Sequence, residues 1–81
     1  MIFYDINPIS EFHLLIIPKI HIPSINELEN KDDFDLSSRM IEIANKIAKA
    51  EKLAGYKLLF NVGEKGGQVV FHLHLHLIGY R

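Results

Sequence analysis

The chain has 81 residues, of which 48% are hydrophobic and 23% are charged, and this balance is typical of one small globular domain. A formal net charge of −1 argues against general binding to nucleic acid or to an anionic membrane surface. The absence of cysteine excludes a disulfide framework and thiolate metal sites, and it fits the reducing cytoplasm, where we expect the protein to reside.

Two strands are predicted near the N-terminus. Residues 1–6 form the first, and the Asn7-Pro8 pair ends it, because proline biases the residue before it towards a turn. Residues 12–18 form the second, and their nearly continuous apolar character predicts a central strand that is buried on both faces. This apolar run is too short to span a bilayer, and no charged-then-apolar leader precedes it, so no membrane partner is expected.

A long helix is predicted after a short helical turn. Ser24 and Glu27 have the spacing of a capping box, so a turn is expected to start at Ser24. Aspartates at the start of the following segment suit the positive end of a helix, and Gly55 is expected at C′, just past its end. Apolar residues recur every three or four positions and form one helical stripe: Leu36, Met40, Ile43, Ile47, Ala50 and Ala54.

Residues 56–62 and residues 69–80 are predicted as a third and a fourth strand. The loop between them, residues 63–68, holds three glycines, so the two strands are expected to form an antiparallel hairpin. The fold class is therefore α+β, an antiparallel sheet with one long helix packed on one face, in the order ββαββ and in a single domain of residues 1–81. The helix is expected to cover one apolar row of the fourth strand: Val69, Phe71, Leu73, Leu75 and Leu77.

The other face of the fourth strand carries a row of three histidines, His72, His74 and His76. An incidental polar row, a metal site and phosphate chemistry can each explain it. Same-face neighbours on a strand lie about 6.5–7 Å apart, so three such histidines reach one ion only with difficulty. His13 is a further possible metal ligand, but no carboxylate is evidently paired with these residues.

Phosphate chemistry suits the row better. Imidazole is a nucleophile that is neutral near pH 7, so one ring can attack phosphorus while its neighbours donate hydrogen bonds to phosphate oxygens. The glycine loop directly precedes the row, and the N–H groups of such loops often hold anions, although a plain hairpin turn also explains the loop.

The stretch GGQVVFHLHLHLIG, residues 66–79, resembles the signature of the histidine triad (HIT) family, in which three histidines alternate with apolar residues. YDINP at residues 4–8, HLLIIPKIHI at residues 13–22 and FNVGEKGGQ at residues 60–68 resemble further family segments. The resemblance extends over essentially the whole chain and is nearest to the nucleoside phosphoramidase-like bacterial branch.

This resemblance implies a role for each matched residue. His74 is the implied nucleophile at the α-phosphate of a purine nucleotide, held by the backbone carbonyl of His72, while His76 stabilises charge on the phosphate. His21 is expected to be a surface or turn residue. No cofactor and no resident metal are implied. The other residues are implied in nucleotide binding: Asp5 at the ribose hydroxyls, Ile6 on the nucleoside wall, His13 near the site, and Asn61 with the backbone of Gly67 and Gln68 at the phosphate.

The implied function is hydrolysis or transfer at the α-phosphate of an AMP-like ligand through a nucleotidyl-histidine intermediate. Two alternatives stay open, a nucleotide-binding remnant with little catalysis and a metal-binding histidine site. The first is open because the chain begins at Met1, within the strand that contains FYDINP (residues 3–8), so the N-terminal segment that closes the base pocket in the family is expected to be lacking. Val69 stands where relatives often carry a serine or threonine that bonds the leaving group, so the leaving group stays open too.

The resemblance also implies a homodimer, formed through the long helix and residues 56–62. Ile41, Ala44 and Ala48 lie outside the main stripe and are expected to form a second apolar helix face that one small sheet leaves uncovered.

Overall fold

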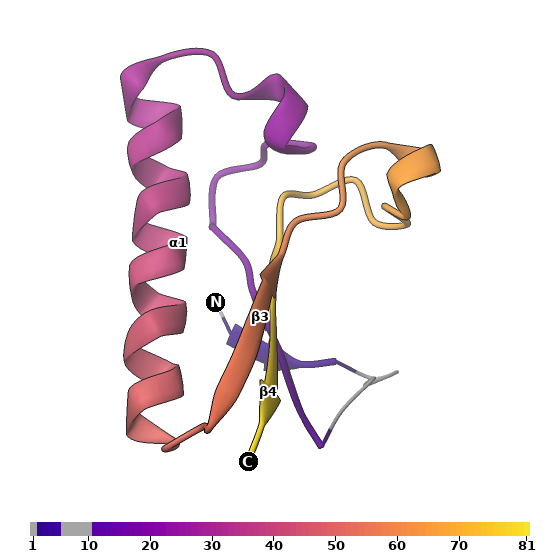
Figure 1. Cartoon of the computed structure of the whole chain (residues 1–81). Coiled ribbons are helices and arrows are strands. Elements are labelled where there is room, and N and C mark those ends of the chain that lie inside the picture. The colour runs from indigo at the N-terminus through magenta and orange to yellow at the C-terminus, as the bar shows by residue number, and fades with distance from the viewer. Residues whose placement is uncertain (1, 6–10) are drawn as a thin grey trace.

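The computed structural model, which describes residues 2–5 and 11–81, contains one four-stranded antiparallel sheet with the order β1-β2-β4-β3. One long helix, α1 (Lys31–Ala50), runs along one face of this sheet (Figure 1). The α+β class and the order ββαββ are confirmed; Ile6 and the predicted Asn7-Pro8 turn lie outside the described residues. The strands are β1 (Ile2–Tyr4), β2 (Phe12–Ile16), β3 (Gly55–Leu59) and β4 (Leu75–Tyr80).

The two middle strands, β2 and β4, position the site. The prediction that β2 is central and buried on both faces is confirmed, since four of its five residues are buried. Leu14 pairs with Leu77, and both belong to the core that packs against α1. Leu15 pairs with His76, one residue along each strand, so side chains at these positions point to the opposite face. The sheet therefore has one face covered by the helix and one face available for a binding site.

Helix α1 contacts the sheet through smaller residues than the sequence predicts. Met40, Ala44 and Ala48 are buried, whereas Ala50 and Ala54, which were assigned to the stripe, are exposed. The prediction of a second, uncovered apolar face is therefore wrong. Of its three residues only Ile41 is exposed, at 44%, whereas Ala44 and Ala48 are buried. Alanine has a small side chain, so it lets the helix backbone come close to the sheet. Ala44 and Ala48, which were predicted to face outwards, therefore lie where the helix and the sheet approach most closely. The other stripe residues are partly buried and flank this contact: Leu36, Ile43 and Ile47.

The C-terminus of α1 also differs from the prediction. The helix is capped at Glu51, and Lys52 adopts the left-handed conformation with φ of 55°, whereas Gly55 begins β3. The N–H of Leu53 donates to the carbonyl of Ala48 at 3.1 Å. This hydrogen bond spans six residues, as the wider turn of a Schellman motif does. This motif brings the Leu53 side chain against Gly79. A Cβ added at Gly79 would lie only 2.5 Å from Leu53 Cδ1.

At the other end of the helix, the predicted turn is present as the short 3₁₀ helix η1 (Ile25–Glu27). Its N-cap is Ser24, whose Oγ accepts the N–H of Asn26 at 3.2 Å and donates to a carboxylate oxygen of Glu27. The capping-box spacing is thus realised through the two side chains. None of the helices among the described residues is long and apolar enough to cross a membrane.

Strand β4 is shorter than predicted, and this changes the histidine row. The strand begins at Leu75, and Leu73, Leu75 and Leu77 are buried as expected. Val69 and Phe71 are 87% and 53% exposed, so their assignment to the buried row is wrong. Strands β3 and β4 pair antiparallel as predicted, but the short hairpin is replaced by a long connection that includes η2 (Glu64–Gly66). The connection between β3 and β4 folds over the segment after β2. The N–H of Leu73 therefore donates to the carbonyl of Ile22 and not to a residue of β3.

Candidate functional site

A pocket of about 590 Å³ opens on the face of the sheet that α1 leaves uncovered. Most of its wall is apolar, and histidine, aspartate and asparagine side chains meet on one part of it. The pocket is lined by Phe3, Tyr4, Asp5, Leu15, Asn61, Gly67, Val69, Val70, His74 and His76. These residues come from β1, β2, β4 and the connection after β3, so no single segment builds the site.

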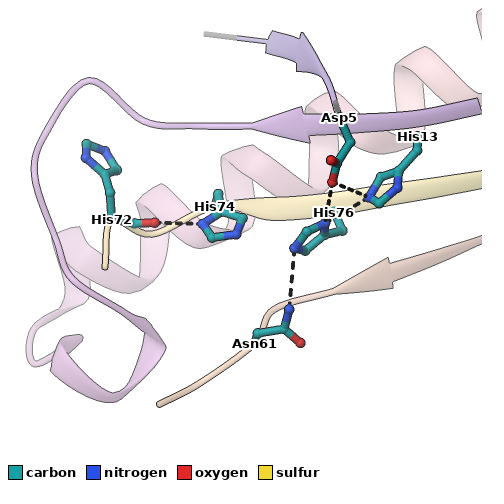
Figure 2. Close-up of polar contacts among 6 residues, drawn as sticks. All are labelled: Asp5, His13, Asn61, His72, His74 and His76. Atoms are coloured by element: carbon teal, nitrogen blue, oxygen red, sulfur yellow. Dashed lines mark hydrogen bonds and ion pairs between the residues drawn. The ribbon is translucent and has the colours of Figure 1, made fainter. Parts of the chain in front are cut away.

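His74 is held in one orientation by the main chain. Its Nδ1 lies 2.7 Å from the carbonyl oxygen of His72 (Figure 2). A carbonyl can only accept, so Nδ1 carries the hydrogen and Nε2 carries the lone pair of the neutral ring. The contact that the family resemblance implies for these two residues is therefore present. It leaves His74 with a nucleophilic nitrogen on a ring that lines the pocket.

The ring of His72 does not share the pocket with the other two histidines. It points away from His74 (Figure 2), and its Nε2 donates to the carbonyl of Pro18 at 3.0 Å. Its Nδ1 lies 3.2 Å from Nδ1 of His21, which is exposed, as expected for a surface residue. The prediction that three histidines share one strand face is thus wrong. His72 lies at a bend before β4, so its ring leaves the face that His74 and His76 share.

His76 belongs to a cluster with Asp5 and His13. Nε2 of His13 lies 2.9 Å from Nδ1 of His76 and 3.2 Å from a carboxylate oxygen of Asp5. Two neutral imidazole nitrogens at this separation need one hydrogen between them. The nearer carboxylate favours placing that hydrogen on His13 Nε2, which then donates to both partners. His76 then carries its own hydrogen on Nε2, which lies 3.5 Å from the Asn61 amide nitrogen; because that nitrogen is itself a donor, this tautomer requires the amide to turn and present its oxygen to His76.

Electrostatics keep His76 neutral. Burial lowers the pKa of its imidazole, and the positive charges of protonated His74 and His13 lower it further, while Asp5 raises it. The net pKa is below the ordinary value of 6.5. Near pH 7 the ring is therefore a neutral donor through Nε2, beside the lone pair of His74, whose ring centroid lies 4.9 Å away.

The glycine loop differs from the anion cradle that the sequence suggests. The N–H groups of Gly66 and Gln68 donate to the carbonyl of Gly63, and that of Gly67 donates to Glu64. A phosphate could use these N–H groups only as a second acceptor. The side chain of Gln68 is 3% exposed and is committed to the loop itself. The role of this backbone at a phosphate stays a prediction.

The sequence therefore identified most of the polar residues that the fold brings together. Asp5, Asn61, Gly67, His74 and His76 line the pocket, and His13 lies behind its wall in contact with two of them. Among the other predicted site residues, His72 contributes a carbonyl, Gln68 lies inside the loop, and Ile6 is outside the described residues. Residues missed on the apolar wall are Phe3, Tyr4, Leu15 and Val70. Period-two spacing places Phe3 on the same face as Asp5, and this signal could have identified it.

Comparisons with known proteins agree with this geometry. The HIT domain family model matches residues 1–81. The purine nucleoside phosphoramidase of Escherichia coli K12 is 46% identical over 81 residues, which cover 98% of this chain and 67% of that protein. A HIT family hydrolase structure from Legionella pneumophila is 51% identical with a TM-score of 0.91, over 99% of this chain and 72% of that one. A histidine triad protein structure from Clostridium difficile is 34% identical with a TM-score of 0.91, over 99% and 70%.

Proposed function

The chain belongs to the HIT domain family, and from this premise we propose that it binds a purine nucleoside monophosphate moiety and breaks a bond at its α-phosphate. The observation that carries the proposal is the 2.7 Å hydrogen bond from His74 Nδ1 to the carbonyl of His72, because it leaves Nε2 unprotonated on a pocket-lining ring. The similar E. coli protein is named a purine nucleoside phosphoramidase, which supports the same substrate class. We also propose that residues 1–81 act as one domain.

The reaction has two steps. In the first, the Nε2 lone pair of His74 attacks the α-phosphorus, a P–N bond forms, and the bond from phosphorus to the leaving group breaks. The leaving group departs with the bonding electron pair and takes up a proton. The imidazole becomes cationic as the P–N bond forms, and the carbonyl of His72, which accepts from Nδ1, stabilises that charge. In the second step water attacks phosphorus and gives up a proton, which balances the one taken up by the leaving group, while the P–N bond breaks, its electron pair returns to Nε2 of His74, and the nucleoside monophosphate is released.

His76 supports the first step as a hydrogen-bond donor. Its Nε2–H lies on the pocket side, because its Nδ1 accepts from His13. Donation from Nε2 to a phosphate oxygen stabilises the negative charge that builds in the transition state. Asp5 and His13 act as positioning residues here, since they decide which nitrogen of His76 carries the hydrogen.

The apolar wall suits a nucleoside. Phe3 is 47% exposed in β1 and pairs with Leu15 of β2, so these two side chains offer a surface on which a base can lie. Asp5 follows directly and is proposed to accept the ribose hydroxyls. We therefore expect AMP to bind better than 2′-deoxy-AMP, and Asp5→Ala to remove the difference. Equal calorimetric affinities of the unmutated protein for both ligands would disprove the ribose role of Asp5.

A second candidate function, nucleotide binding with little turnover, is favoured by one observation. Val69 and Val70 line the pocket, yet they are 87% and 62% exposed, so water reaches this side of the site freely. A poorly enclosed site positions a substrate less well and protects its reacting atoms less from solvent. The chain spans 67% of the length of the E. coli phosphoramidase.

We propose in addition that the protein forms a homodimer through β3 and α1. All five residues of β3 are exposed, and the strand is at the edge of the sheet with one side unpaired. Tyr56, Leu58 and Leu59 are 39%, 37% and 44% exposed on this strand, and Ile41 of α1 is 44% exposed. The predicted alanine face does not contribute, so this strand is the main support for the dimer.

The experiment uses a radiolabelled adenosine phosphoramidate, with rapid quenching and peptide mapping, in the presence of a chelator. We expect the unmutated protein to turn over and to carry label on His74. His74→Asn should abolish turnover and retain AMP binding within a few-fold, whereas the control His21→Asn should retain turnover. Label on His76 or an active His74→Asn protein would refute the proposed nucleophile. AMP binding without turnover in the unmutated protein would favour the second candidate function.

A further inference from the structure

The peptide group that joins His72 to Leu73 is held on both of its sides. Its carbonyl accepts the hydrogen of His74 Nδ1 at 2.7 Å, and its N–H donates to the carbonyl of Ile22 at 2.6 Å. A trans peptide is planar, so its carbonyl and its N–H point in opposite directions. The group that orients the proposed nucleophile therefore lies between His74 and the segment after β2, and it cannot turn without losing both bonds.

The bond to Ile22 also strengthens the bond to His74. Donation from the N–H of Leu73 polarises the peptide group, and a polarised carbonyl is a better hydrogen-bond acceptor. Leu73 is 2% exposed and Ile22 is 9% exposed, so little water competes for this bond. The Ile22 carbonyl thus acts on His74 through one peptide group, although Ile22 does not line the pocket.

The ring of His72 ties the same residue to the same segment. It is directed away from His74 (Figure 2), and its Nε2 donates to the carbonyl of Pro18 at 3.0 Å. Pro18 is buried and His72 is half-buried. Because the ring of His72 does not line the pocket, it is placed to act on His74 through the main chain and not through a bound ligand.

The neighbouring His21 makes a weaker contact with this ring. Its Nδ1 lies 3.2 Å from Nδ1 of His72, and the two rings meet edge to face with their centroids 5.0 Å apart. Because Nε2 of His72 carries a hydrogen, Nδ1 of the neutral ring is an acceptor. His21 is exposed, so a water molecule can donate to that nitrogen in its place. The Pro18 carbonyl is therefore the contact that decides where the ring of His72 lies.

The segment that makes these contacts, residues 18–23, is itself held in place. Proline stands at both of its ends, Pro18 and Pro23, and proline fixes the backbone angle φ. Ile22 belongs to the hydrophobic core, and the carbonyl of Pro23 accepts from Nε2 of Gln68 at 2.6 Å. Bonds to this segment therefore restrict the peptide group more than bonds to a mobile loop would.

The orientation of this peptide group decides which nitrogen of His74 carries the hydrogen. In neutral imidazole either nitrogen can carry it, and the hydrogen-bond partner of one nitrogen sets the choice. With the His72 carbonyl in place, the hydrogen is on Nδ1 and the lone pair is on Nε2. If the peptide group turned away, Nδ1 would lose its acceptor and the hydrogen could move to Nε2, where it removes the nucleophilic lone pair.

We propose that His72 is a positioning residue, whose ring anchors the peptide group of residues 72–73 to residues 18–23 and thereby keeps the lone pair of His74 on Nε2. This inference rests on the proposed function of His74, and it adds a role for a side chain that the two reaction steps do not use. The ring and the Ile22 carbonyl act together, but of the two only the ring is removed by a substitution.

The test compares His72→Phe, which keeps an aromatic ring but has no donor, with His72→Gln, whose amide can still donate to the Pro18 carbonyl. Turnover of the adenosine phosphoramidate should fall by about 10- to 100-fold in His72→Phe, as expected for a misplaced nucleophile, while AMP affinity stays within a few-fold. His72→Gln should recover most of the loss. The matched control is His21→Asn, which removes the other contact of the ring and should behave as the unmutated protein does.

A second measurement reports the tautomer of His74 without a substrate. Nitrogen NMR of histidine-labelled protein, in alkaline solution where imidazoles are neutral, distinguishes a ring nitrogen that carries a hydrogen from one that does not. The signals of His74 are those that His74→Asn lacks. The unmutated protein, His72→Gln and His21→Asn should carry the hydrogen on Nδ1, whereas His72→Phe should show a mixture of both tautomers.

The outcomes separate the possibilities. A His72→Phe protein that keeps its turnover and the single tautomer of His74 would overturn the positioning role, and so would a His72→Gln protein that is as impaired as His72→Phe. If circular dichroism shows His72→Phe to be unfolded, His72→Ala provides the variant without a donor. If the unmutated protein does not turn over but His72→Phe still changes the tautomer, the positioning role stands and the proposed function alone fails.

Discussion

Gln68 is the residue whose replacement tests most sharply how the pocket loop is held. Its Oε1 accepts the N–H of Gly63 at 2.9 Å, and its Nε2 donates to the carbonyls of Pro23 at 2.6 Å and Val70 at 3.1 Å. The side chain is 3% exposed. One buried amide thus ties the loop to itself, to the start of the histidine segment and to the chain after β2.

The replacement Gln68→Leu keeps the approximate size of the side chain and removes all three hydrogen bonds. Each bond contributes about 0.5–1.5 kcal/mol net, so the free energy of unfolding should fall by about 3 kcal/mol, with backbone groups left unpaired adding to the loss. The measurement is urea unfolding followed by circular dichroism. The control is Asn45→Ala, which removes one exposed hydrogen bond of 3.4 Å to Tyr56 and should cost about 0.5 kcal/mol or less.

Gln68→Leu should also weaken AMP binding. Gly67, Val69 and Val70 line the pocket on either side of the replaced residue, so a loosened loop has to be ordered when the ligand binds. Ordering that costs about 1.4 kcal/mol would lower the affinity tenfold. If Gln68→Leu lost no more stability than Asn45→Ala and bound AMP normally, the side chain would not hold the loop, and the reasoning would be refuted.

Three further predictions concern stability and assembly. Gly79→Ala should cost about 1–3 kcal/mol, because its Cβ would meet Leu53 Cδ1 at 2.5 Å, whereas the control Gly55→Ala, with nothing within 4 Å of its Cβ, should cost far less in thermal unfolding; equal losses would contradict this. Because the pKa of His76 is lower in the folded protein than in the unfolded chain, the unfolded chain binds the proton at a higher pH. The free energy of unfolding should therefore be largest above pH 6.5 and should decrease as the pH falls below it. His76→Gln, measured with a chelator present, should reduce this pH dependence, and an unchanged slope would assign it to other groups. In sedimentation experiments the protein should form a dimer that Leu58→Glu converts to monomer, and a monomeric unmutated protein would rule the interface out.

Much of the fold follows from local patterns in the sequence. The continuous apolar run in residues 12–18 identified a central strand, because only a strand with neighbours on both sides buries both of its faces. The alternation of Leu73, Leu75 and Leu77 identified the face that packs against the helix. Polar residues such as Asp5, Asn61 and His74 were assigned to a site through the resemblance to the HIT family, and the fold brings them to one pocket.

The tertiary structure decided what depends on contacts between distant segments. The chain before Leu75 pairs with the segment after β2, so His72 turns away and the histidine row divides. Ala44 and Ala48 face the sheet because their small side chains let the helix pack closest to it. The spacing of large apolar residues, from which the helix stripe was predicted, does not report this closeness. The cluster of Asp5, His13 and His76 depends on the pairing of β1, β2 and β4, and strand register arises from the whole sheet. The sequence by itself therefore determined which residues could do chemistry, and the packing of the sheet decided which of them meet.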